Sequence, residues 1–166
     1  MAIQMPASLR IEVDLARQQL RLYAADTLIA EYAVSTARNG AGERLNSECT
    51  PRGQHVIAAK IGTDAPTNTV FSGRIATGEY YSPAYAATQP AGRDWILTRI
   101  LWLSGCEPGV NQGGECDTYA RYIYLHGTPD QTPVGQVGSR GCIRMRNADI
   151  LELFAQVEIG TPVLIG

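Results

Sequence analysis

Cys142 is the residue of this sequence best suited to act as a nucleophile, because of its neighbours in the segment Ser-Arg-Gly-Cys-Ile-Arg at 139–144. The preceding Gly141 lets the backbone approach a substrate closely, so we expect the amides of Gly141 and Cys142 to form an oxyanion hole. Arg140 and Arg144 supply positive charge, which favours a thiolate over a thiol. The pattern predicts attack of Cys142 on a peptide carbonyl.

His126 is the candidate general base for this cysteine. It follows the apolar segment 122–125 and precedes Gly127, so we expect it where a strand ends and a loop begins. The roughly 16 residues between His126 and Cys142 allow the chain to return to the same place. A backbone carbonyl near Gly127 can orient the imidazole as a carboxylate does. A Cys and His pair is weak evidence by itself, since free cysteine is often a small buried hydrophobe.

The remaining cysteines and the second histidine have plainer interpretations. His55 lies within a strand pattern, and we expect it and Cys49 to be structural. There is no Cys-x-x-Cys and no histidine pair at a ligand spacing, so no metal site and no cofactor are expected. Cys106 and Cys116 flank a glycine-rich loop, and a disulfide between them is an alternative to two free thiols.

Mostly strands must position these residues. One amphipathic helix is predicted over residues 147–157, with Asn147 as its cap, because apolar residues recur there every three or four positions. Residues 64–93 are irregular and rich in turn formers, which suggests a flap. Alternation and β-branched residues predict strands at 9–15, 20–23, 28–34, 55–61, 95–103, 121–125 and 163–165.

Length and composition limit the class of protein. The 166 residues are 45% hydrophobic, which suits one domain over residues 1–166 with a sizeable core. A formal net charge of -2 gives no general reason to bind nucleic acid or an anionic membrane surface. No apolar run approaches a membrane-spanning length. The sequence as written begins without an export signal, so we expect a cytoplasmic location; a periplasmic one is the alternative if a signal was removed.

Taken together, the motifs resemble those of a known family, the YkuD-type L,D-transpeptidase catalytic domain. That family has a His-Gly followed, after a short loop, by Ser/Thr-x-Gly-Cys-hydrophobic-Arg/Asn, which matches His126-Gly127 and segment 139–144 here. The likeness extends to Val-Ser-Thr at 34–36, Thr-Pro-Arg-Gly at 50–53 and Gly-Thr-Pro-Val at 160–163. One departure is Arg140, where the family usually has a histidine that is not the catalytic base.

The resemblance implies a mainly β fold, namely a mixed β-sheet sandwich with one amphipathic helix after the catalytic cysteine. It also implies a thioacyl intermediate and peptidoglycan stem peptides as substrates. In this picture Cys142 is the nucleophile, His126 the base and the Gly127 carbonyl its orienter.

The outcome of the reaction depends on what attacks the thioester. Water gives an L,D-carboxypeptidase, which we expect here for tetrapeptides of muropeptide recycling because no export signal is seen. A peptide amine gives an exported, cross-linking L,D-transpeptidase, and a non-catalytic peptide-binding module is the alternative from another class. Ser139 and the basic cluster Arg140, Arg144 and Arg146 are predicted to meet the substrate, although Arg146 is better explained as a solvated surface residue.

Overall fold

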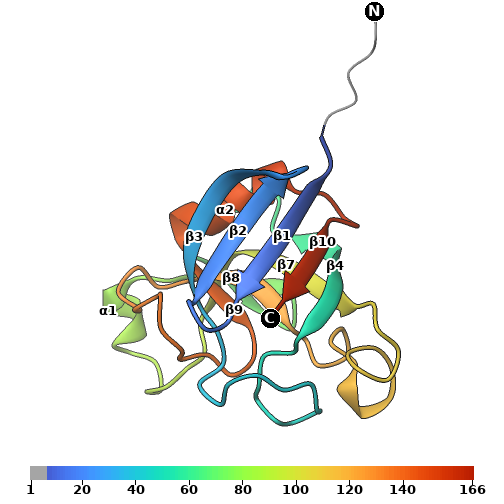
Figure 1. Ribbon diagram of the computed structural model, residues 1–166. Coiled ribbons are helices and arrows are strands. Elements are labelled where there is room, and N and C mark those ends of the chain that lie inside the picture. Colours follow the sequence, from blue (N-terminus) through green and yellow to red (C-terminus); the bar gives the residue numbers. More distant parts are fainter. Residues whose placement is uncertain (1–6) are drawn as a thin grey trace, which may run out of the picture.

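The computed structural model describes residues 7–166, and strands form most of it (Figure 1). The predicted meander near the amino terminus is confirmed, because the first three strands pair in sequence as antiparallel neighbours. In order along the chain, the elements are β1 (Leu9–Asp14), β2 (Gln19–Ala24), β3 (Thr27–Ser35), β4 (Gly53–Ile61), β5 (Thr69–Ser72), β6 (Ile75–Tyr80), α1 (Pro83–Ala86), β7 (Ile96–Gly105), the 3-10 turn Gly114–Cys116, β8 (Tyr124–Thr128), β9 (Ile143–Arg146), α2 (Asn147–Gln156) and β10 (Pro162–Ile165).

Within residues 7–166 the strands form a ten-stranded mixed sheet in the order β4-β10-β1-β2-β3-β9-β8-β7-β5-β6. Two neighbouring pairs are parallel, β1 with β10 and β8 with β9. Strand β4 also pairs with β7, so the sheet closes on itself and leaves only the β5–β6 hairpin outside the ring. The predicted mainly β fold with a mixed sheet is therefore confirmed.

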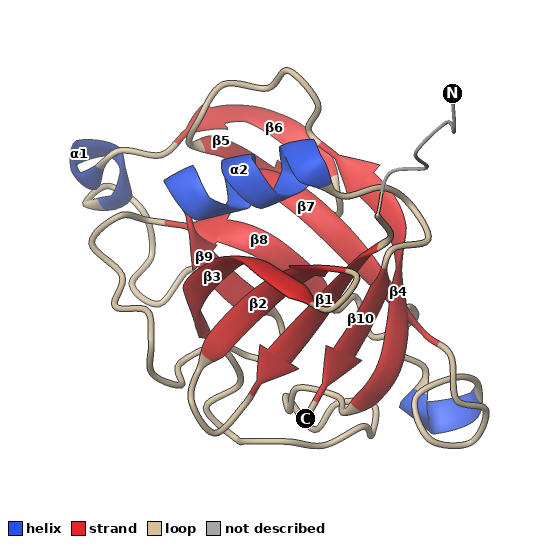
Figure 2. Cartoon of the chain, turned by 45° about the horizontal axis from the view of Figure 1, so that its top comes forward, coloured by secondary structure: helices blue, strands red, loops and turns tan. Residues whose placement is uncertain are grey.

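The core lies inside this closed sheet and beneath α2. Alternate residues of the first strands point inward, among them Ile11 and Leu22, which are almost completely buried. Helix α2 lies across β7 and β8 and contacts β9 (Figure 2). Its face with Ile150 and Leu153 joins the same apolar cluster, which confirms the predicted amphipathic helix. The core thus fixes β7, β8 and β9 firmly from one side.

The prediction of an irregular flap over residues 64–93 is wrong in part. These residues contain the β5–β6 hairpin and the short helix α1, and β5 extends the sheet by pairing Val70 with Leu97 of β7. Strand β6 is largely exposed on both faces, so it has no apolar alternation to reveal it. Only its pairing with β5 holds it as a strand.

The prediction is also inaccurate around the two motifs. Strand β8 begins at Tyr124 and runs to Thr128, so the predicted strand at 121–125 is displaced and His126 lies inside a strand instead of at its exit. Strand β9 was not predicted. Asn147 is the first residue of α2 and not its cap; its buried side chain accepts a hydrogen bond from Thr98 and donates to Asn68 and Asp130.

Candidate active site

The parallel pairing of β8 with β9 brings the two motifs together. Cys142 directly precedes β9, and the register of Leu125 opposite Ile143 sets Cys142 beside Tyr124. Cys142 and His126 line one cavity of about 460 Å³, a size that suits a small peptide. The predicted return of the chain between His126 and Cys142 is therefore present in the fold.

His126 is almost completely buried, and its two ring nitrogens have different surroundings. Nδ1 lies 2.7 Å from the carbonyl oxygen of Gly127. A carbonyl oxygen only accepts, so Nδ1 carries the proton and Nε2 of the neutral ring keeps its lone pair. Nε2 is buried without a hydrogen-bond partner among the described residues. Burial also lowers the pKa of His126 below its usual value, which keeps the imidazole neutral.

Gly127 fits its position because there is no room for a side chain. A Cβ there would lie 2.4 Å from Oδ1 of Asn147 and 2.6 Å from the carbonyl oxygen of Leu97. This close packing holds the Gly127 carbonyl where His126 uses it. The predicted orienter therefore contacts the predicted base in the structure.

The thiol of Cys142 lies between two backbone groups of its neighbour strand. The Tyr124 amide donates to Sγ at 3.4 Å, and Sγ lies 3.4 Å from the carbonyl oxygen of Tyr122. Although Cys142 is partly exposed as a residue, burial raises the pKa of its thiol to about 12; the Tyr124 amide and the charges of Arg144 and Arg121 lower it by less. Arg144 therefore favours the thiolate, as predicted, but desolvation outweighs this effect and the thiol remains protonated at rest.

The turn before Cys142 is held by Ser139. Its hydroxyl donates to the Cys142 carbonyl oxygen at 2.5 Å and accepts from the Gly141 amide at 3.2 Å. The Gly141 amide is therefore not available as an oxyanion donor, contrary to the sequence prediction. Ser139 was predicted to meet the substrate, but its hydroxyl is used to hold the turn. Gly141 has φ +132°, and a Cβ there would lie 3.2 Å from the Cys49 carbonyl oxygen.

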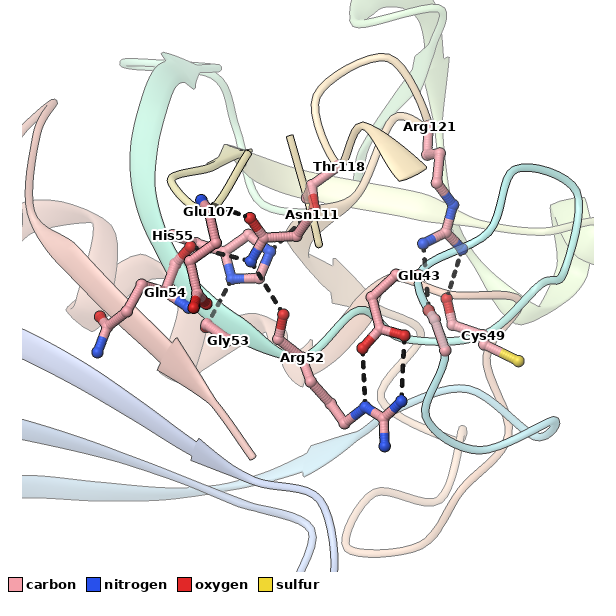
Figure 3. Close-up of polar contacts among 11 residues, drawn as sticks. Glu43, Cys49, Arg52, Gly53, Gln54, His55, Glu107, Asn111, Thr118 and Arg121 are labelled. Atoms are coloured by element: carbon pink, nitrogen blue, oxygen red, sulfur yellow. Dashed lines mark hydrogen bonds and ion pairs between the residues drawn. The ribbon is translucent and has the colours of Figure 1, made fainter. Parts of the chain in front are cut away.

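The segment behind Gly141 is fastened by a buried polar network, part of which Figure 3 shows. Arg121 donates to the Cys49 carbonyl oxygen at 2.7 Å, and the Thr50 hydroxyl donates to the Gly141 carbonyl oxygen at 2.9 Å. Nearby, the His55 ring contacts the Thr118 hydroxyl and the Gly53 carbonyl oxygen, each at 2.9 Å. His55 and Cys49 therefore have structural contacts outside the cavity, as expected from the sequence.

The arginines of the cavity differ in what they contact. Arg144 pairs with Asp94 at 2.9 Å, so its charge is already partly balanced. Arg140 is exposed and donates to the Gly92 carbonyl oxygen. The sequence prediction missed Arg74, which lies at the tip of the β5–β6 hairpin and also lines the cavity. The only local signal was a Gly-Arg pair within a stretch of turn formers.

Other sequence predictions concern the cysteines and the membrane. All four cysteines are free thiols, so Cys106 and Cys116 form no disulfide here. None of the helices within residues 7–166 is long and apolar enough to cross a membrane.

Comparison with known proteins identifies the family. The family model described as the L,D-transpeptidase catalytic domain (YkuD) matches residues 8–165. The putative L,D-transpeptidase YkuD of Bacillus licheniformis is 30% identical over 156 residues, which cover 94% of this chain and 64% of that protein. Its namesake in Bacillus subtilis is 38% identical over 110 residues, 66% of this chain and 64% of that protein. This chain thus spans just under two thirds of both relatives.

Solved structures show the same fold at low sequence identity. An L,D-transpeptidase from Mycobacterium smegmatis matches with a TM-score of 0.56 and 16% identity, covering 96% of this chain and 59% of that chain. L,D-transpeptidase 3 from Mycobacterium tuberculosis matches with a TM-score of 0.59 and 13% identity, covering 96% and 61%. By its sequence match over nearly all its length, the chain belongs to the L,D-transpeptidase catalytic domain family of cysteine-dependent enzymes.

Proposed function

We propose that this protein forms a thioester between Cys142 and the acyl group of a peptidoglycan stem tetrapeptide, releasing the terminal D-alanine. The observation that carries the proposal is the buried Nε2 of His126, which has no hydrogen-bond partner among residues 7–166 and shares the cavity with the Cys142 thiol. A buried nitrogen without a partner is costly, and such costs are tolerated where the atom accepts a proton during a reaction.

Both groups of the pair are neutral at rest, and this determines how the first step proceeds. The Cys142 sulfur attacks the carbonyl carbon of the diamino acid residue, and the thiol proton moves to His126 Nε2 as the bond forms. Collapse of the tetrahedral intermediate breaks the bond to D-alanine, whose nitrogen takes the proton from His126. The carbonyl of Gly127 holds the imidazole throughout and is close to the positive charge that forms on the ring.

For the second step we propose water as the acceptor, which makes the protein an L,D-carboxypeptidase. The cavity around Cys142 is lined by four arginines, Arg74, Arg121, Arg140 and Arg144, and by a single carboxylate, Asp94. This positive balance attracts the carboxylates of a stem peptide and repels the ammonium group of a second peptide. Water carries no charge and is not repelled. Such an activity suits soluble muropeptides in the cytoplasm, a location that cell fractionation would test.

Cross-linking is the second candidate, because another hollow adjoins the first. This hollow of about 260 Å³ shares Arg121, Tyr122, Ile123 and Arg140 with the cavity and contains Glu48. The carboxylate of Glu48 suits an approaching ammonium group. An L,D-transpeptidase would use such a route for its acceptor peptide.

Mass spectrometry of a disaccharide tetrapeptide incubated with the protein distinguishes these functions. We expect loss of one D-alanine with the wild type, and no loss with Cys142→Ala. Cys106→Ala is the matched control, because Cys106 is exposed and lies outside the cavity. If cross-linked dimers were the main product, the activity would be transpeptidation and not hydrolysis. If every protein left the tetrapeptide unchanged, a non-catalytic binding module would be the remaining interpretation.

A further inference from the structure

Arg74 occupies an unusual backbone position at the tip of the β5–β6 hairpin. Ser72 pairs with Ile75, so Gly73 and Arg74 form a two-residue turn, with φ of 54° and 67°. Turns of this kind favour Gly, Asn or Asp at both central positions, because a side chain with positive φ is crowded. A long cationic residue here carries a steric cost, and such outliers often occur where function requires them.

Aromatic side chains hold the Arg74 guanidinium in place. Its Cζ lies 4.4 Å from the ring centre of Tyr122 and 4.9 Å from that of Trp102, and Nη1 donates to the Tyr124 hydroxyl at 3.0 Å. Trp102 is itself fixed, since it stacks on Tyr119 at 3.8 Å between ring centres and donates to the Tyr119 carbonyl oxygen. We call this group, Arg74 with Trp102, Tyr119, Tyr122 and Tyr124, the arginine clamp.

The clamp is built on the residues that contact the nucleophile. Tyr124 donates its amide to Cys142 Sγ, and the Tyr122 carbonyl oxygen lies 3.4 Å from the same atom. The side chains of these two residues contact Arg74, while their backbones contact the sulfur. Arg74 and Cys142 also line the same cavity. The position of the guanidinium is therefore tied to the position of the thiol.

Among the cavity's arginines, Arg74 has a charge that no carboxylate or backbone carbonyl oxygen of residues 7–166 engages. No Asp or Glu in residues 7–166 forms an ion pair with it. Arg144 is paired with Asp94, Arg121 is occupied by backbone carbonyl oxygens, and Arg140 points to Gly92. Aromatic faces hold a cation without neutralising it, so Arg74 remains able to bind an anion.

We propose that Arg74 binds a carboxylate of the peptide substrate and so sets where the scissile carbonyl lies relative to Cys142. The inference rests on the proposed function, because it concerns the substrate of that site. The planar guanidinium donates paired hydrogen bonds to a carboxylate, and the clamp lowers the conformational entropy that Arg74 loses on binding it. A stem tetrapeptide with lysine as its diamino acid offers two candidates, the terminal D-alanine carboxylate and the α-carboxylate of its second residue.

Amidated substrates distinguish this role from a merely structural one. Release of the terminal amino acid is followed for three tetrapeptides: one with both carboxylates free, one amidated at the terminus and one amidated at the second residue. Arg74→Gln should raise KM for the free acid by about 10- to 100-fold, with a smaller change in kcat. One of the two amidated peptides lacks the carboxylate that Arg74 binds. For that peptide the KM of the wild type should rise by the same factor, and Arg74→Gln should raise it no further. That peptide identifies the carboxylate.

Two further variants make the test independent of folding. Arg74→Lys keeps the charge and the aromatic contacts but lacks the planar fork, so we expect an intermediate KM. Arg17→Gln removes an exposed arginine outside the cavity and should leave KM unchanged. Equal losses for Arg74→Gln on all three peptides would show a structural role and overturn the inference, as would no loss at all. A wild type that releases nothing from any peptide would instead refute the proposed function, and the inference with it.

Discussion

Replacing Gly127 by alanine is a sharp test of how the fold positions the base. Gly127 does not have a positive φ, so alanine suits its backbone, and any cost must come from the added methyl group. That Cβ would lie 2.4 Å from Oδ1 of Asn147, 2.6 Å from the carbonyl oxygen of Leu97 and 3.2 Å from Cβ of Thr98. Leu97 is the strand partner of Gly127 on β7, which is covered by α2. Neither Gly127 nor Leu97 can therefore move freely.

These distances give the size of the effect. To reach ordinary contact, the two oxygens must retreat by roughly 0.8 to 1.0 Å. Overpacking of this kind costs about 1 to 3 kcal/mol, and two hard contacts with a fixed strand put the expected loss of unfolding free energy near 3 kcal/mol. The Gly127 carbonyl moves with its backbone, so His126 is displaced as well. A displacement of about 1 Å at a catalytic group costs roughly 100-fold in rate.

Urea unfolding and tetrapeptide turnover measure the two effects. Gly138→Ala is the matched control, because Gly138 also lacks a positive φ and a Cβ there would meet Ser35 Oγ at an ordinary 3.4 Å. Asn147→Ala removes three hydrogen bonds and is destabilising by itself, but it should cost less in the Gly127→Ala background than in the wild type, because it also removes one of the two clashes. The steric reasoning would be refuted if Gly127→Ala were no less stable than Gly138→Ala, or turned over substrate at the wild-type rate.

Four other predictions concern protonation. Because burial lowers the pKa of His126, the neutral base persists in acid, and the acidic limb of the kcat/KM profile should lie below about pH 6.5; a limb above that value would contradict the assignment. Burial lowers the pKa of His55 as well, so as the pH falls the unfolded chain binds a proton at His55 before the folded chain does. The free energy of unfolding should therefore decrease below about pH 6.5, which urea unfolding at pH 5 and pH 7 would check. The raised pKa of the Cys142 thiol predicts slow iodoacetamide alkylation at pH 7, and rapid reaction would indicate a thiolate at rest. Asp94 raises that pKa and Arg144 lowers it, so Asp94→Asn should accelerate alkylation and Arg144→Gln should slow it further.

The sequence by itself determined the chemistry and most strands. Segment 139–144 and His126-Gly127 are continuous motifs, so their residue types indicate a thiol, a base and a backbone orienter without any knowledge of the fold. The strands of the meander and helix α2 were predicted because each has one buried face, and burial of one face leaves a periodic pattern. Strand β6 is exposed and left no such pattern.

Only the tertiary structure decided the state and the surroundings of these groups. Parallel pairing of β8 with β9 sets the thiol against the Tyr124 amide, and packing against the buried cluster of Phe71, Ile100 and Tyr124 desolvates it enough to raise its pKa despite nearby arginines. Arg74 reaches the cavity from a hairpin that is far away in sequence, whereas the expected Arg144 is paired with Asp94. The physical reason is that desolvation and ion pairing depend on which atoms surround a group. Residues distant along the chain supply those atoms, and local patterns carry no record of them.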